Sequence, residues 1–165
     1  MTGFLFLRPR GLFGRLIGAV THHEPGVPEV CHVAVVLGEA QDGTWQVGES
    51  WAGEGVRMVR WSKEDAIFVP YDFNRPHAME WFVSHSGQGY DWLALPWMAV
   101  VGMASFVKVQ LRRNPFQSRS RWYCSEAAIT ATETEALFST TQVTPQTMLN
   151  TLYRKMVNQA EAVSE

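Results

Sequence analysis

Short runs of apolar and β-branched residues dominate the first half of the chain. They are separated by turn-forming stretches, written GEAQDG, AGEG and SKEDA in the sequence, and runs bounded in this way are typical of β-strands. Because the last four runs are joined by short connections, we expect these strands to pair as an antiparallel meander. The predicted strands are Phe4–Leu7, Val30–Leu37, Thr44–Ser50, Val56–Trp61 and Ile67–Phe73.

Other parts of the chain have the apolar spacing of helices. Leu12, Leu16 and Val20 fall on one face of a short helix, and further helices are predicted over RPHAMEWFVSHS, residues 93–111 and residues 125–138. The last helix is expected to start with Thr144 as N-cap and Pro145 as its first residue. The buried stripe predicted for this last helix is Met148, Leu149, Leu152, Tyr153 and Met156.

Together these patterns predict one α+β domain over residues 1–165, in which an antiparallel sheet of about five strands packs with helices. A chain of 165 residues is long enough to bury a core without disulfides or metals. Its formal net charge of -2 gives no reason to expect a nucleic-acid partner.

The apolar stretches of the sequence do not favour a membrane anchor. The N-terminus has no convincing signal peptide, which predicts a cytoplasmic protein as synthesised. The longest apolar stretch, Leu93–Val107, is shorter than the ~20 residues that a spanning helix needs. We interpret it as a buried helix, with contact to a membrane surface as the weaker alternative.

The residues around His32 introduce candidate chemistry. Neighbouring residues of a strand point to opposite faces, so Cys31 cannot be the partner of His32. Cys31 is interpreted as a small buried hydrophobe. His32 is either a core histidine bonded to backbone or a catalytic base. If the next strand pairs with it as a hairpin, Glu49 can lie beside the imidazole and orient it. The alternative for Glu49 is a solvated strand end.

Cys124 lies in the stretch RWYCSEAAITA, at the start of a predicted helix. A single cysteine is more often structural than catalytic. At a helix start, however, the positive end of the helix dipole and the unpaired N–H groups favour a thiolate. The same N–H groups can stabilise an oxyanion, and a cysteine, a histidine and a carboxylate together suit nucleophilic catalysis.

Five motifs appear in a characteristic order: CHVAVVLG, VGES, GQGYDW, WYCSEAA and VTPQTML. In this order they resemble the circularly permuted NlpC-type cysteine hydrolases, most closely the YiiX/YebB-like group. The resemblance covers roughly Gly3 to Leu152. It departs from the family at Phe4, where an Asp is common after Gly, and at Cys31, where a Ser is common before the histidine.

The resemblance implies a papain-like fold in which the cysteine helix follows the sheet. It implies Cys124 as nucleophile, His32 as general base and Glu49 as the orienting third member. Tyr123 is a candidate for the oxyanion site, with Ser125 and Tyr90 as further candidate substrate or oxyanion residues. Asp91 and Tyr90 can alternatively cap the helix that follows them. No cofactor and no metal is expected.

The function expected from the resemblance is cleavage of an amide or ester bond through an acyl-enzyme. Peptidoglycan stem peptides are the first substrate choice, which suggests carriage on a virion or phage tail, since no export signal is seen. A lipid amide or thioester is the second choice, because related permuted enzymes include lecithin retinol acyltransferase-like proteins. A non-catalytic virion or binding module that keeps the fold is the alternative.

Other polar residues are given less weight. A zinc site near His22 and His23 matches no standard ligand spacing, and His77 and His85 are expected to be structural. An arginine cluster could bind a substrate carboxylate but is more simply a solvated loop; it consists of Arg112, Arg113, Arg119 and Arg121.

Overall fold

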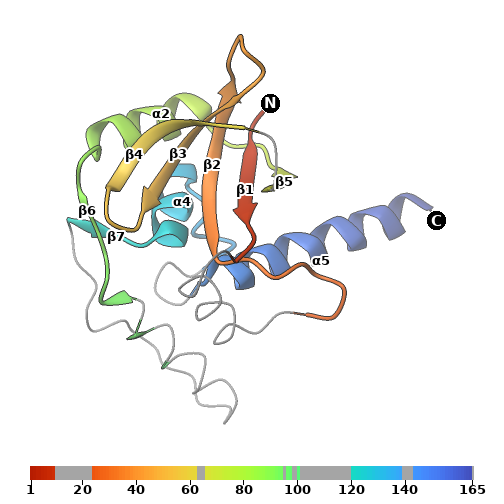
Figure 1. Cartoon of the computed structure of the whole chain (residues 1–165). Coiled ribbons are helices and arrows are strands. Elements are labelled where there is room, and N and C mark those ends of the chain that lie inside the picture. The colour runs from red at the N-terminus through yellow and green to blue at the C-terminus, as the bar shows by residue number, and fades with distance from the viewer. Residues whose placement is uncertain are drawn as a thin grey trace.

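The computed structural model describes residues 1–9, 24–62, 66–94, 96–97, 100, 120–138 and 143–164. These residues form an α+β structure with a five-stranded antiparallel sheet, a short two-stranded sheet and three helices (Figure 1). The strands are β1 (Gly3–Leu7), β2 (His32–Glu39), β3 (Trp45–Trp51), β4 (Gly55–Trp61), β5 (Ala66–Pro70), β6 (Gly89–Tyr90) and β7 (Arg121–Trp122). The helices are α2 (Arg75–Ser84), α4 (Cys124–Thr132) and α5 (Pro145–Ser164).

The main sheet has the strand order β4-β3-β2-β1-β5. The predicted meander is confirmed for β2, β3 and β4, but it is wrong for β5, which pairs with β1 instead of β4. The sheet curls enough for Trp45 on β3 to contact Phe68 on β5, with ring centroids 4.9 Å apart. Pairing with β1 therefore lets β5 close the curl and cover apolar side chains on the inner face.

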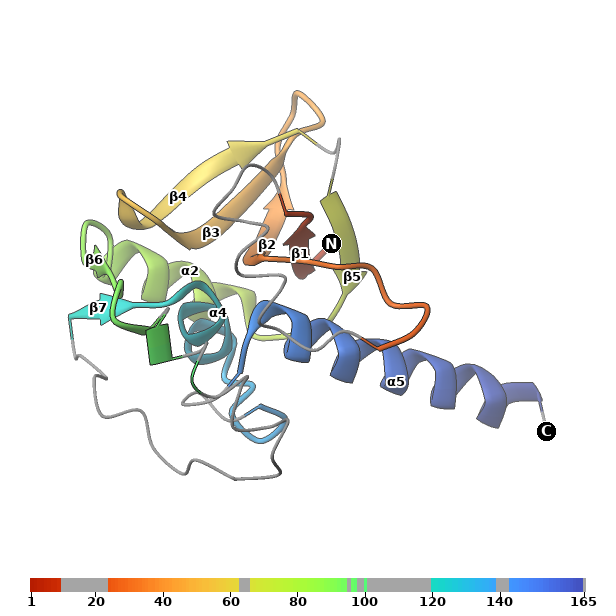
Figure 2. The same ribbon diagram turned by 60° about the horizontal axis from the view of Figure 1, so that its bottom comes forward.

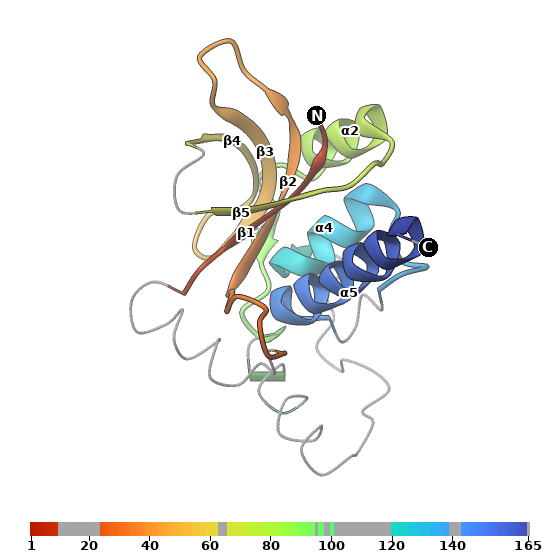
Figure 3. The same cartoon turned by 90° about the vertical axis from the view of Figure 1, so that its right-hand side faces the viewer.

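The three described helices lie on one side of the curved sheet (Figure 3). The core between sheet and helices includes Phe6 and Val33 from the sheet, Phe82 from α2 and Ile129 from α4, all with no exposed surface. Burying a side chain of this size contributes about 2 kcal/mol each. Gly48 allows the close approach of α2, because a Cβ at this position would lie 2.3 Å from the Phe82 ring.

A second cluster lies on the other face of the sheet, inside the curl. Leu5, Ala34, Val36 and Val47 are fully buried there, and Trp45 is nearly so. Both faces of β2 are therefore covered, which explains its nearly continuous run of apolar residues. His32 begins this strand and interrupts neither cluster.

Two predictions about the helices are wrong: where α4 ends, and the burial of Met156 on α5. The helix predicted over residues 125–138 ends at Thr132, because Glu133 adopts a left-handed conformation with φ 54°. The Thr132 hydroxyl also donates to the Ala128 carbonyl at 2.7 Å, which offers the backbone an alternative to a further turn. Met156, predicted to be buried, is 47% exposed, because α5 extends beyond the sheet (Figure 1).

The start of α5 agrees with the sequence. Pro145 is its first residue, and the Thr144 hydroxyl accepts the Thr147 N–H at 3.1 Å, as an N-cap does. The predicted helix with Leu12, Leu16 and Val20 and most of the predicted 93–111 helix lie outside the described residues. Of the helices that are described, none is long and apolar enough to cross a bilayer.

Candidate active site

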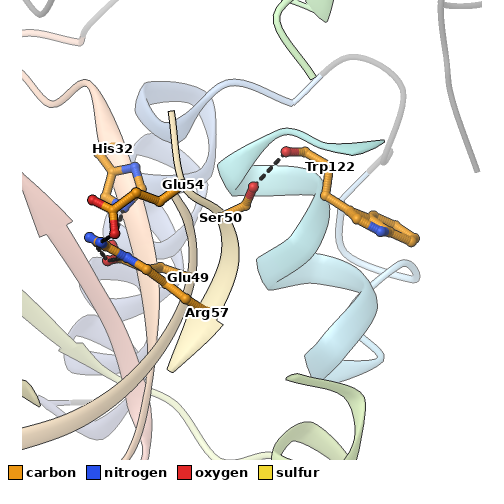
Figure 4. A network of polar contacts seen from close by, with 6 residues as sticks. All are labelled: His32, Glu49, Ser50, Glu54, Arg57 and Trp122. Atoms are coloured by element: carbon orange, nitrogen blue, oxygen red, sulfur yellow. Dashed lines mark hydrogen bonds and ion pairs between the residues drawn. The ribbon is translucent and has the colours of Figure 1, made fainter. Parts of the chain in front are cut away.

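The short parallel pair of β6 and β7 brings the GQGYDW stretch beside the chain that leads to Cys124 (Figure 2). The carbonyl of Trp122 is held from two directions. It accepts the Ser50 hydroxyl at 2.6 Å (Figure 4), and it accepts the Asp91 N–H at 3.3 Å. The Trp122 indole N–H donates to the Gln88 side chain at 2.7 Å. These contacts fix the residue two positions before the thiol. The sequence alone did not single out Ser50 or this pairing.

Cys124 is the first residue of α4, and Tyr123 is its N-cap. The first N–H groups of a helix have no carbonyl in a preceding turn, so they surround the thiol with positive partial charge. Cys124 is only 1% exposed. The hydroxyl of Ser125 donates to the Val143 carbonyl, so this side chain ties α4 to the chain entering α5 and its proton is already committed.

His32 and Glu49 are in direct contact, as the hairpin argument predicted. His32 Nε2 lies 2.8 Å from Glu49 Oε2 (Figure 4), and the Glu49 side chain is completely buried. Burial raises the pKa of Glu49, but His32 and Arg57 outweigh it and the net pKa is lowered. An ionised carboxylate only accepts hydrogen bonds. His32 Nε2 therefore carries the proton, and Nδ1 is left for a second partner.

Cys124 is the group that suits this second position, because it lies close enough to His32 to raise the pKa of the imidazole. Burial lowers the pKa of His32, but Cys124 and Glu49 together raise it to about 9. The imidazolium form is thus stabilised on both sides. An imidazolium between a thiol and a carboxylate is the arrangement that supports a thiolate nucleophile.

Arg57 and Trp51 are members of this site that the sequence reasoning missed. Arg57 Nε and Nη2 donate to Glu49 Oε1 at 2.9 Å and 2.7 Å, and the guanidinium lies 5.3 Å from the centre of the Trp51 ring. Trp51 is also edge-on to His32, with ring centroids 4.8 Å apart. The turn in AGEG was the available signal, because a hairpin with Trp51 opposite Gly55 places Glu49 opposite Arg57.

Two tyrosines flank the thiol. Tyr123 and Tyr90 are 1% and 7% exposed, and their rings lie 5.8 Å apart. Burial, and after it the nearby Cys124, raises the pKa of both phenols well above the usual value. The Tyr123 hydroxyl lies near Cys124 without a well-aligned hydrogen bond to any described group. It is therefore a neutral donor available beside the sulfur.

The interpretation of Cys31 as a buried hydrophobe is wrong. Cys31 is partly exposed, and it forms no disulfide. The exposure arises because Cys31 precedes the first residue of β2 and lies at the end of the sheet. Its N–H donates to the Leu7 carbonyl at 3.0 Å. A negative charge on its thiol would help to raise the pKa of Tyr90 and Tyr123. Cys31 thus lies near the same tyrosines as Cys124.

The remaining candidates do not join this site. Asp91 Oδ1 accepts the Leu93 N–H at 3.1 Å and so caps a turn. His77 lies 3.7 Å from Glu133, and His85 stacks on Trp81 with ring centroids 4.2 Å apart. Within the described ranges no three His, Cys, Asp or Glu side chains gather as a metal site would require. The described part of the chain excludes His22 and His23, and also Arg112, Arg113 and Arg119.

No protein-family model, curated protein or solved structure matches the chain. The site is therefore interpreted from its own geometry: a thiol at a helix start, a histidine near it whose Nε2 contacts a buried carboxylate, and an arginine behind the carboxylate.

Proposed function

We propose that the protein is a thiol hydrolase that cleaves an amide or ester bond through an acyl-enzyme. The observation that carries the proposal is that Glu49 and Cys124 both act on His32: the carboxylate contacts Nε2 at 2.8 Å, and the nearby thiol raises the pKa of the imidazole. These three residues match the roles of nucleophile, general base and orienting group.

The chemistry assigned to these groups has two stages. The Cys124 thiolate attacks the substrate carbonyl, and the His32 imidazolium gives its Nδ1 proton to the leaving amine or alcohol, which leaves a thioester on Cys124. A water molecule then attacks the thioester while His32 Nδ1 accepts its proton, and the thiolate is released with the acid product. Glu49 keeps the proton on Nε2 throughout, because it stays ionised and accepts only.

The developing oxyanion needs donors beside the sulfur. We assign this role to the first-turn N–H groups of α4 and to the Tyr123 hydroxyl, which is buried near Cys124 with no aligned partner. Ser125 is a weaker candidate, since its hydroxyl already donates to Val143. Tyr90 packs on Tyr123 and is assigned to the wall of the site.

For fold family and substrate we infer a permuted papain-like, NlpC-type enzyme acting on peptidoglycan stem peptides, with a virion or phage tail as its carrier. The support is the order of the five motifs together with the α+β architecture, in which a cysteine helix follows the antiparallel sheet. The second candidate is a non-catalytic binding or virion module. The observation favouring it is the 1% exposure of Cys124, since a substrate must displace part of what covers the thiol.

Alkylation by iodoacetamide as a function of pH separates these candidates. In a Cys31→Ser background, we expect Cys124 to react already at neutral pH, and a His32→Asn variant to react more slowly there, because the imidazolium supports the thiolate. Burial slows the reaction at every pH, so the shape of the profile is the informative quantity. If the alkylation rate of wild-type Cys124 rises only near pH ~8.5, Cys124 is not an activated nucleophile and the non-catalytic module is favoured.

The substrate is tested separately, by incubating the protein with soluble muropeptides and detecting new amino groups. We expect the wild-type protein to release amino groups from the muropeptides and the Cys124→Ser variant to release none. A reactive Cys124 with no release would retain the hydrolase class and reject the peptidoglycan assignment.

A further inference from the structure

We propose that Arg57 is a positioning residue of this site, which holds Glu49 in the orientation that supports His32. The inference rests on the proposed function for its catalytic meaning, but its structural claim can be tested without any substrate.

The geometry divides the two oxygens of Glu49 between two partners. Oε2 faces His32 Nε2 at 2.8 Å, whereas Oε1 receives both N–H groups on one edge of the guanidinium, at 2.9 Å and 2.7 Å. Glu49 and Arg57 are directly opposite each other on β3 and β4, so their side chains share a face of the sheet. With both oxygens held, the carboxylate cannot rotate away from the imidazole.

Burial makes the second partner necessary. The Glu49 side chain has no exposed surface, and a buried carboxylate that loses donors has no water to replace them. Without Arg57, no arginine N–H would stabilise negative charge on Oε1, and burial would favour the protonated carboxyl group. A neutral Glu49 supports an imidazolium less than a carboxylate does.

The surroundings of Arg57 favour an arginine over a lysine. Its remaining edge reaches Glu54, an exposed carboxylate on the turn before β4, and its flat face lies over Trp51. The charged and titratable groups around it are therefore Glu49 and Glu54 directly, with His32 and Cys124 beyond Glu49. Only a planar group with several N–H donors can make two contacts to one oxygen while stacking on a ring.

The test compares Arg57→Gln and Arg57→Lys with Arg60→Gln, an exposed arginine of the same strand that pairs with Asp42. The His32 pKa is measured by NMR titration of its imidazole, with the signal assigned by a His32→Asn variant. We expect the pKa to fall by roughly one unit in Arg57→Gln, by less in Arg57→Lys, and not at all in Arg60→Gln. Cys124 alkylation at pH 7 should fall by roughly tenfold in Arg57→Gln.

An unchanged His32 titration in Arg57→Gln would overturn the proposal. A rise would also overturn it, because Arg57 would then act on His32 as a repelling charge and not as a support for Glu49. If Arg57→Gln does not fold, the pKa in Arg57→Lys decides in the same way. Failure of the hydrolase proposal is recognised independently, by an ordinary alkylation profile of wild-type Cys124.

Discussion

The ribbon formed by β2, β3 and β4 carries an arginine–carboxylate pair across neighbouring strands or turns towards each end, Arg60–Asp42 and Arg57–Glu49, and these two pairs differ in burial. At one end Arg60 Nη1 and Asp42 Oδ2 lie 3.1 Å apart, with side chains 70% and 49% exposed. At the other end Arg57 Nη2 and Glu49 Oε1 lie 2.7 Å apart, with side chains 23% and 0% exposed. The functional groups are the same, so the surroundings decide what each pair does.

The difference shows why only one end is a candidate site. Water and salt screen the exposed pair, so it contributes little to stability and cannot perturb its neighbours. At the buried end, burial alone would lower the pKa of His32, but Cys124 and Glu49 act on it with little screening and together raise it to about 9. Burial thus converts an ordinary ion pair into a set of coupled groups.

The largest effect is expected from removing the negative charge at each end. Glu49→Gln should lower the free energy of unfolding by about 3 kcal/mol, because the amide leaves His32 and Arg57 without a buried anion and turns an NH₂ group towards one of these donors. Asp42→Asn should give no resolved change, because asparagine keeps the oxygen that accepts the Thr44 N–H at 3.0 Å. Urea unfolding at pH 7 and low salt measures both.

Added salt provides the control for this comparison. In 1 M NaCl the difference between Glu49→Gln and wild type should persist, since a buried pair is screened little. Equal losses in the two variants would mean that burial does not distinguish the two ends.

The sequence predicts the part of the fold that depends on neighbouring residues. The strands around His32 and Glu49 follow from alternation and turn residues, and the N-cap at Thr144 from a local motif. The pairing of β5 with β1 does not follow, because the choice between two possible neighbours is made by the curl of the whole sheet. The early end of α4 at Glu133 likewise depends on a backbone conformation that helix propensity does not reveal.

The candidate site, like the fold, has some features that local sequence patterns predict and others that they do not. The contact between His32 and Glu49 could be predicted from strand parity and a hairpin, and Arg57 could have been added from the register of the next turn. The hydrogen bond of Ser50 to Trp122 joins residues 72 positions apart, so no local pattern indicates it. The exposure of Cys31 depends on where the strand begins, which sequence patterns locate only to within a few residues.

The next effect is a pH dependence that only the buried end should produce. The pKa of His32 is about 9 in the folded protein against an ordinary 6.5, so its stabilisation is complete below pH 6.5 and is lost as the pH rises through 9. We expect the free energy of unfolding to fall by on the order of 2 kcal/mol between pH 7 and pH 10. Asp42 has a lowered pKa, so its contribution is lost only as the pH falls.

Cys124→Ser tests the cause of this slope. Because Cys124 helps to raise the His32 pKa, the variant should lose less stability over the same pH range. A wild-type stability that is flat or rising from pH 7 to pH 10 would contradict the raised pKa.

The smallest effect concerns hydroxyl groups at the two ends. Ser50 follows Glu49 on β3, faces the helices and donates to the Trp122 carbonyl at 2.6 Å, whereas the Thr44 hydroxyl donates to Asp42 at the exposed end. Ser50→Ala should lower the free energy of unfolding by about 1 kcal/mol, since the carbonyl keeps its bond from Asp91. Thr44→Val should give no resolved change, because water replaces the lost contact. If Ser50→Ala also left the Cys124 alkylation rate unchanged, Ser50 would stabilise the chain before α4 without setting the position of the thiol; a slower rate with the same pH profile would show that it sets both.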